Sequence, residues 1–170
     1  MSILVCPRCR SPLVERSSKT DPELRCSNGG CALSLSPFPF IENQPVLVDF
    51  EQSLLDEVML KARSGTSVRK RDPGRRGLMS RLRRYAIGEN QVARRFADEF
   101  TAGVQRLAET PRVLVIGGGE VGSGIARLYQ TASVGVIGTD IYISPYTTLV
   151  ADGHGLPFAD QSLDGVWIQA

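Results

Sequence analysis

Two continuous apolar runs in the second half of the chain predict buried strands. Residues 112–116 read Arg-Val-Leu-Val-Ile, and residues 134–139 read Val-Gly-Val-Ile-Gly-Thr. Strands buried on both faces of a parallel sheet show such unbroken runs, because other elements cover both sides. A shorter pattern lies nearer the N-terminus, where residues 40–41 and 46–48 flank a polar turn at 42–43 and predict a small hairpin.

Two other stretches have the three-to-four-residue apolar spacing of amphipathic helices. The first helix is predicted over residues 50–62 with Asp49 as its N-cap, and the second over residues 89–109. We expect the apolar stripe of the second helix to contact the core. That stripe consists of Val92, Phe96, Phe100, Val104 and Leu107. Between the helices, residues 64–77 predict a loop and residues 78–85 a short basic amphipathic helix.

The composition is that of an ordinary globular protein. The chain has 170 residues, of which 42% are hydrophobic and 22% charged, and this excludes collagen-like, fully disordered and membrane-spanning classes. No apolar run approaches the roughly 18 residues that a transmembrane helix needs. The first residues lack the features of a signal peptide. We therefore expect a cytoplasmic protein.

The net charge of +2 hides an uneven distribution. Residues 61–84 carry ten lysines and arginines against one acid, Asp72, so this basic block has a charge of +9 and the rest of the chain −7. The block is interpreted as a solvated linker. The alternatives are a surface for RNA, another phosphate-rich partner or an acidic protein, and attachment to a membrane surface. Aromatic residues that would stack on bases are almost absent from it.

All four cysteines lie within the first 31 residues, at Cys6, Cys9, Cys26 and Cys31. Two close pairs separated by a gap of this size are typical of a tetrahedral structural zinc site, in which each pair offers two thiolates. A segment of about 45 residues buries too little apolar area to fold unaided, so metal binding would supply folding free energy. A disulfide framework would need an oxidising compartment, which nothing in the sequence indicates.

The cysteine region resembles the zinc-ribbon family of small methyltransferase-activator subunits. The resemblance covers residues 1–50 and rests on Cys-Pro-Arg-Cys at 6–9, on the second cysteine pair, and on Phe-Pro-Phe-Ile-Glu-Asn-Gln-Pro-Val-Leu-Val at 38–48. It implies a ribbon of the kind that activates tRNA, rRNA and release-factor methyltransferases or is fused to methyltransferase domains. One departure is Arg10, which stands where these ribbons often have glycine.

A glycine-rich turn follows the strand predicted at 112–116. Residues 117–124 read Gly-Gly-Gly-Glu-Val-Gly-Ser-Gly and lead into a helix predicted over 125–130, and the next strand ends in Asp140. Strand, glycine turn and helix form a Rossmann-like nucleotide-binding arrangement, in which an acid after the second strand accepts hydrogen bonds from ribose. This pattern fits both NAD and S-adenosylmethionine.

The segment at 149–167 resembles class I S-adenosylmethionine-dependent methyltransferases. It reads Leu-Val-Ala-Asp-Gly-His-Gly-Leu-Pro-Phe-Ala-Asp-Gln-Ser-Leu-Asp-Gly-Val-Trp, like the third strand and following loop of that family. The resemblance implies contacts of Asp152 and Gly153 with adenine and of Gln169 with the methionine part. The full set of expected cofactor-binding residues is Gly117, Gly118, Gly119, Gly122, Asp140, Ile141, Asp152, Gly153 and Gln169. His154 is interpreted as a surface residue and Trp167 as a core residue, and no catalytic residue is assigned.

These observations predict an α/β chain with three parts. Residues 1–50 form the zinc ribbon, 51–110 a helical segment with the basic linker, and 111–170 the first part of an incomplete Rossmann-like parallel sheet of about four strands. The predicted function is methyl transfer from S-adenosylmethionine to an unidentified acceptor, with structural Zn²⁺. The alternatives are a non-catalytic module that docks on a protein or RNA, and an NAD(P)-binding oxidoreductase. We expect the chain to be the front of a longer enzyme or to depend on a partner.

Overall fold

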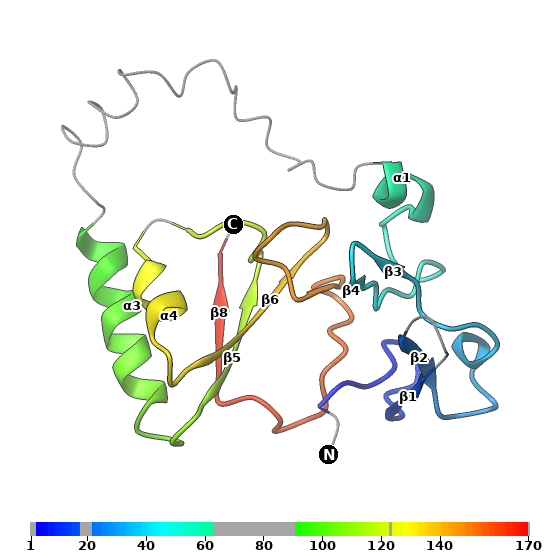
Figure 1. Cartoon of the computed structure of the whole chain (residues 1–170), viewed down its shortest axis with the longest axis horizontal. Helices are drawn as coiled ribbons and strands as arrows, with labels where there is room; N and C mark the ends of the chain where they lie inside the picture. Colours follow the sequence, from blue (N-terminus) through cyan, green and yellow to red (C-terminus); the bar gives the residue numbers. More distant parts are fainter. Residues whose placement is uncertain (1–2, 18–21, 63–90, 123, 170) are drawn as a thin grey trace.

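The computed structural model describes residues 3–17, 22–62, 91–122 and 124–169. Its centre is a four-stranded parallel sheet, with two helices on one side and the cysteine-containing N-terminal part, followed by a short helix, on the other (Figure 1). The expected α/β class with about four parallel strands is therefore confirmed. None of the helices in these ranges is long and apolar enough to cross a membrane.

The strands of the sheet lie in the order β7-β6-β5-β8, and each neighbouring pair is parallel. Their bounds are β5 Arg112–Ile116, β6 Gly135–Asp140, β7 Leu149–Val150 and β8 Gly165–Ile168. Strand β5 is central, and its successive residues Leu114 and Val115 are both almost fully buried although they point to opposite faces. The unbroken apolar run at 112–116 thus predicted burial on both faces correctly.

Two helices cover one face of the sheet, α3 (Gln91–Val104) and α4 (Ala126–Gln130). The buried residues between the helices and the sheet are Val104, Val113, Val115, Ile125, Leu128 and Val134. Trp167 of β8 packs edge-to-face on Phe100 of α3, with ring centroids 5.3 Å apart. Trp167 therefore contributes to this apolar layer, as expected.

The apolar stripe expected along the second helix is only partly buried. Val92, Phe96 and Leu107 are 63%, 60% and 68% exposed, and α3 ends at Val104 instead of 109. The buried positions of this helix are Ala97, Thr101 and Val104. At the start of α3 the end of the glycine-rich turn approaches closely, since a Cβ on Gly124 would lie 2.6 Å from the Arg94 nitrogen and 3.1 Å from the Ala93 Cβ. The helix therefore meets this turn through Ala93 and not through Val92 or Phe96.

The N-terminal part consists of two small hairpins around the cysteines. Strands β1 (Leu13–Ser17) and β2 (Pro22–Cys26) are antiparallel, a 3₁₀ turn follows at Ala32–Ser34, and β3 (Phe40–Ile41) pairs with β4 (Gln44–Pro45). The predicted turn at 42–43 is confirmed, since both of its residues have positive φ angles. Residues 46–48, expected as the second strand of this hairpin, instead continue to the edge of the sheet.

At that edge, Val46 forms a parallel bridge with Val150 of β7, and the Leu47 N–H donates to the Val150 carbonyl over 2.9 Å. A shared core covers the adjacent face of the sheet. Its buried members are Cys6, Leu13, Cys26, Cys31, Phe38, Leu47, Leu114, Leu149, Ala151 and Phe158. The cysteine-containing part and the sheet therefore bury apolar surface against each other.

The first predicted helix is shorter than expected. Helix α1 spans Glu57–Ala62 and not 50–62, and Asp49 does not cap it. The Asp56 carboxylate takes that place, accepting a 2.8 Å hydrogen bond from the Val58 N–H. Asp49 is buried and pairs with Arg8. The helix predicted at 78–85, and nearly all of the basic block at 61–84, lie outside the described residues.

Candidate metal centre and carboxyl edge of the sheet

The four cysteines come from two tight turns. Cys6 and Cys9 lie before β1, Cys26 ends β2, and Cys31 precedes the 3₁₀ turn. The first turn is closed by the Arg10 N–H, which donates to the Cys6 carbonyl over 3.0 Å, and the second by the Cys31 N–H, which donates to the Asn28 carbonyl over 2.9 Å. Local backbone bonds thus aim both cysteine pairs at one point.

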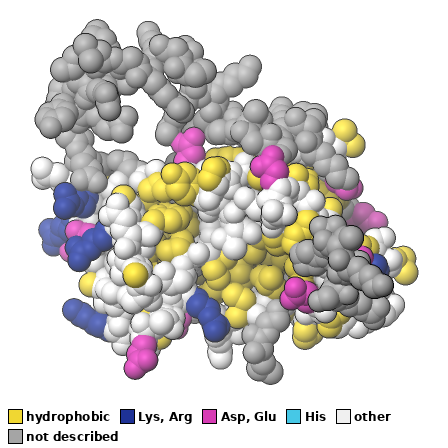
Figure 2. All heavy atoms as spheres, viewed as in Figure 1, with side chains coloured by type: hydrophobic (Ala, Val, Ile, Leu, Met, Phe, Trp, Pro, Cys, Tyr) yellow, Lys and Arg dark blue, Asp and Glu magenta, His cyan; other side chains and the backbone are white. Residues whose placement is uncertain are grey.

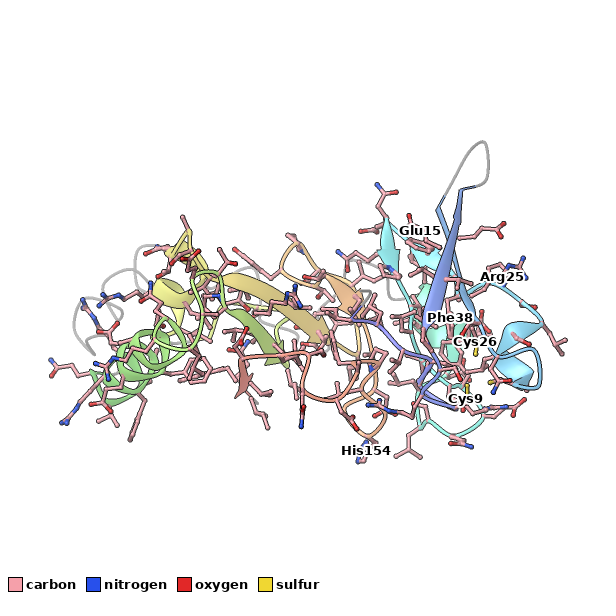
Figure 3. All side chains as sticks on the ribbon, turned by 90° about the horizontal axis from the view of Figure 1, so that it is seen from below. Cys9, Glu15, Arg25, Cys26, Phe38 and His154 are labelled. Carbon is pink, nitrogen blue, oxygen red and sulfur yellow. The ribbon has the colours of Figure 1, made fainter. Side chains whose placement is uncertain are left out.

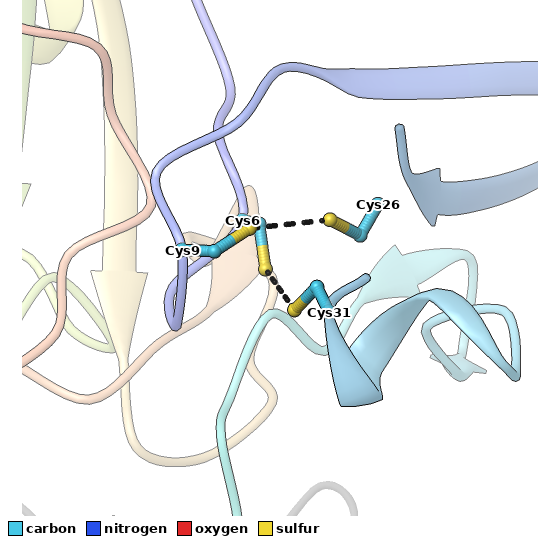
Figure 4. Close-up of side chains that lie close together, drawn as sticks. All are labelled: Cys6, Cys9, Cys26 and Cys31. Atoms are coloured by element: carbon cyan, nitrogen blue, oxygen red, sulfur yellow. Dashed lines mark hydrogen bonds between the residues drawn. The ribbon is translucent and has the colours of Figure 1, made fainter. Parts of the chain in front are cut away.

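The four sulfur atoms lie within 4.8 Å of one another (Figure 4). The Cys6 and Cys31 Sγ atoms are 3.9 Å apart, those of Cys9 and Cys26 are 3.4 Å apart, and all four cysteines are free. Four sulfurs at about 2.3 Å from a tetrahedral Zn²⁺ would be about 3.8 Å from one another. The cluster could therefore hold a metal ion such as zinc, with a closed shell that leaves no position for a substrate.

Burial and hydrogen bonding set the cysteine pKa values in opposite directions. Burial raises the pKa of the Cys6 thiol, and it raises that of Cys26 to about 12. Hydrogen bonds from the Ser11 side chain and backbone lower the pKa of Cys9 to about 6. A metal ion binds thiolates, so its binding must displace the protons that burial keeps on Cys6 and Cys26.

Arg8, inside the first cysteine pair, is bound to the segment that leaves the second hairpin. Its guanidinium donates to both carboxylate oxygens of Asp49, and the bond from Nε is 2.6 Å long. A third hydrogen bond, of 2.7 Å, goes from the same guanidinium to the Glu51 carboxylate. The hydrogen bonds from Arg8 hold the pKa of Asp49 below its usual range. Because this pKa is lowered by folding, the carboxylate stabilises the fold above its unfolded pKa, and the contribution is lost as the pH falls through the folded pKa.

We expect Asp49→Asn to lower the melting temperature at neutral pH by several degrees, because the buried end of the Arg8 pair loses its charge. Glu51→Gln is the matched control, because it removes the other negative charge that pairs with Arg8. The Glu51 side chain is 78% exposed, and exposed ion pairs contribute little to the free energy of unfolding. Thermal melts of the two variants at equal zinc content measure the difference. Equal melting temperatures would contradict a structural role for the Arg8–Asp49 pair.

The carboxyl ends of the four parallel strands bring the expected nucleotide-binding residues to one edge. In register, Ile116 pairs with Thr139 and Ile168, and Asp140 pairs with Val150. The residues that follow these strand ends are Gly117, Gly118, Gly119, Gly122, Ile141, Asp152, Gly153 and Gln169, with Asp140 as the last residue of β6. Positions far apart in the sequence thus share one end of the sheet.

The glycine-rich turn packs tightly against neighbouring side chains. Gly117 has a φ of +74°, and a Cβ there would lie 2.1 Å from the Gln169 carbonyl oxygen. A Cβ on Gly119 would lie 2.4 Å from the Tyr142 ring. Gly117 therefore needs glycine for reasons internal to the chain, whereas a side chain at 119 would require the Tyr142 ring to move. Tyr142 joins the site although sequence patterns gave no signal for it.

Asp140 links the glycine-rich turn to β6. Its carboxylate accepts hydrogen bonds from the Gly119 N–H over 2.9 Å and the Ile141 N–H over 2.7 Å. Burial raises the pKa of this carboxyl, although both hydrogen bonds oppose the shift. The Ile141 side chain is 42% exposed beside it. The Asp140 and Ile141 pair thus presents a carboxylate and an apolar surface at the same edge.

Asp152 is held by two residues that sequence patterns did not connect with it. The Ser53 hydroxyl donates to one carboxylate oxygen. The other oxygen accepts a 2.9 Å hydrogen bond from the His154 backbone N–H, and the His154 ring Nδ1 also lies 2.9 Å from this oxygen. Burial raises the pKa of Asp152, but these hydrogen bonds outweigh burial and lower it. His154 itself points into solvent, as expected (Figure 3). Gly153 is exposed.

Gln169 closes the glycine-rich turn from the end of β8. Its Nε2 donates to the Gly117 and Glu120 carbonyls over 2.7 and 2.6 Å. Its Oε1 is buried and has no hydrogen-bond partner among the described residues, and it lies 2.4 Å from where a Gly122 Cβ would be. A buried acceptor without a donor is unfavourable in a folded protein unless a ligand or water supplies the donor.

The structure thus joins the glycine-rich turn to Asp140 through Gly119 and to Gln169 through Gly117, whereas Asp152 lies at the same edge but bonds to Ser53 and His154. Neither the family models nor the curated proteins that were searched give a match to this sequence.

Proposed function

We propose that this chain binds S-adenosylmethionine at the carboxyl edge of its sheet, as part of an enzyme that transfers the methyl group to an acceptor, and that the four cysteines hold a structural Zn²⁺. One observation carries the proposal: the ends of four adjacent parallel strands gather the glycine-rich turn, Asp140, Asp152 and Gln169.

The strand order supports a Rossmann-like interpretation. Counted along the sequence, β7-β6-β5-β8 is the order 3-2-1-4, which is the first part of a doubly wound sheet. In such sheets the ligand binds outside the carboxyl ends of the strands, next to the first and fourth strands where the order reverses. Gly117 and Gln169 follow those two strands here.

The side chains fit the parts of this cofactor. Asp140 offers a carboxylate to the ribose hydroxyls, and Ile141 an apolar surface to the adenine ring. The buried Gln169 Oε1 lacks a donor, which the ammonium group of the methionine part would supply. When bound, the cofactor supplies an electrophilic methyl group on sulfur, and the protein mainly positions the two reactants.

Calorimetric titration with S-adenosylmethionine, S-adenosylhomocysteine and NADH tests the proposal. We expect both adenosyl compounds to bind and NADH not to bind. Binding of NADH alone would replace the proposal with an NAD(P)-dependent oxidoreductase.

We expect Asp140→Ala to weaken S-adenosylhomocysteine binding at least about tenfold, the effect of losing a hydrogen bond to a charged group. The wild-type affinity is also expected to fall as the pH is lowered into the range where aspartates bind protons. Because the pKa of Asp140 is raised, its carboxylate is neutralised at a higher pH than that of an exposed aspartate. Asp140→Ala should remove this pH dependence. Glu109→Ala, an equal loss of charge at an exposed residue before β5, is the control.

An apolar cleft is the observation that favours the alternative, a non-catalytic docking module. A cleft of about 440 Å³ lies between the N-terminal part and the sheet, with Leu114, Leu156 and Leu163 in its wall. Val166 and Ile168 of β8 are 47% and 71% exposed, and Figure 2 shows apolar side chains gathered over the middle of this face. The alternative would be favoured if the chain bound neither adenosyl compound and instead bound a peptide in this cleft.

A further inference from the structure

Two arginines in the first cysteine turn reach out of the N-terminal part in different directions. Arg8 lies between Cys6 and Cys9, and Arg10 directly follows Cys9. Each binds a different segment that leads to Asp152. Two short series of contacts, one through Arg8 and one through Arg10, therefore connect the metal centre with the carboxyl edge of the sheet.

Arg10 contacts the segment between β7 and β8. Its guanidinium donates to the Leu156 carbonyl over 2.7 Å, to the Phe158 carbonyl over 2.5 Å and to Asp160 over 3.1 Å. The backbone of Arg10 has a φ of +62°, a conformation that favours glycine. A backbone conformation that favours glycine is thus occupied by an arginine, whose planar guanidinium can donate to two carbonyls at once.

The segment at 152–160 is held by the N-terminal part through backbone bonds as well as through Arg10. It contains no helix or strand, and its backbone is bound to the N-terminal residues by the Val5 N–H, which donates to the Pro157 carbonyl, and the Ala159 N–H, which donates to the Ile3 carbonyl, both over 2.9 Å. Its first residue, Asp152, is one of the residues proposed to contact the cofactor.

Arg8 is connected with the Asp152 carboxylate indirectly, through the segment at 49–53. It binds Asp49 and Glu51, and the Ser53 hydroxyl two residues later donates to Asp152. The backbone of the cysteine turn, which fixes both arginines, is closed by the Arg10 N–H bond to the Cys6 carbonyl. An ion bound by Cys6 and Cys9 would hold this turn in the same shape.

We infer that the metal centre positions the segment at 152–160 through Arg10, so that metal and cofactor strengthen each other's binding. The part concerning the cofactor rests on the proposed function. Arg10 is a positioning residue in this inference, since it touches carbonyls of the segment and not the cofactor. Coupling between two binding sites is reciprocal, so the factor by which zinc raises cofactor affinity is the factor by which the cofactor raises zinc affinity.

The test compares the zinc-loaded wild type with Arg10→Gly, which removes the side chain but accepts the positive φ without strain. Hydrogen exchange is measured by mass spectrometry in peptides covering 152–160. We expect Arg10→Gly to bind one zinc with unchanged affinity, to exchange faster in this segment, and to bind S-adenosylhomocysteine at least about fivefold more weakly. Arg10→Lys, which keeps the charge but not the fork, should fall between the two.

A second readout follows zinc instead of the cofactor. S-adenosylhomocysteine should slow the release of zinc to a coloured chelator in the wild type and should not do so in Arg10→Gly. Unchanged exchange at 152–160 in Arg10→Gly would overturn the positioning role, whether or not the cofactor binds. A third outcome separates the two proposals. If Arg10→Gly exchanges faster at 152–160 but the wild type binds no adenosyl compound, the positioning role of Arg10 is supported and the proposed function is wrong.

Discussion

Removing the metal is expected to unfold the cysteine-containing part and to destabilise the sheet in the same step. Cys6, Cys26 and Cys31 are buried in one cluster with Leu114 of the central strand and Phe158 of the segment before β8. Fewer than 50 residues cannot supply a core of their own, and structural zinc commonly contributes the folding free energy of such units. We expect Cys26→Ser to abolish stoichiometric zinc and to lower the melting temperature by roughly 10 °C or more.

Zinc content by atomic absorption and thermal melts by circular dichroism measure these effects. Ser27→Ala, at the exposed neighbouring residue, is the matched control and should behave like the wild type. A chelator should reproduce the Cys26→Ser melt in the wild type and leave the melt of Cys26→Ser itself unchanged. A reduced, metal-free wild type that melts like the zinc-loaded protein would contradict the structural role of the metal.

Sequence patterns predicted correctly the elements that are determined by neighbouring residues in the chain. The apolar run at 112–116 predicts a strand buried on both faces, and the polar pair at 42–43 predicts a tight turn. The spacing of the cysteine pairs predicts a cluster because each pair sits in a turn closed by its own backbone bonds. The gathering of residues at the carboxyl edge follows from parallel strands whose ends coincide.

Contacts between distant segments could not be predicted in this way. Ser53 and Asp152 are 99 positions apart, and Arg10 and Phe158 are 148 apart. Asp49 has the residue type of a helix cap, but its buried carboxylate pairs with Arg8, and the helix begins later, at Glu57. The apolar stripe of α3 predicted burial at its start wrongly, because the turn at Gly124 packs on Ala93 and Arg94 while Val92 and Phe96 face solvent. Each difference arises from packing that no window of sequence contains.

The second large effect is expected from Phe158→Ala, which tests whether the N-terminal part and the sheet unfold together. Phe158 is 5% exposed, bridges to Leu4 through its backbone, and packs in the cluster that contains Cys6 and Leu114. Truncating a buried phenylalanine lowers the free energy of unfolding by about 3–5 kcal/mol. Leu35→Ala, at a side chain that is 80% exposed, should change it by less than about 0.5 kcal/mol.

Urea unfolding followed by two probes decides the question. Fluorescence of Trp167, the single tryptophan, follows β8, and zinc release to a chelator follows the cysteine cluster. We expect both transitions to share one midpoint in the wild type and to shift together in Phe158→Ala, because the mutated side chain belongs to a core that both parts share. If only the tryptophan transition shifts, the cysteine-containing part folds independently. The hydrogen bonds of Arg10 and Val5 would then join two separate units instead of one cooperative structure.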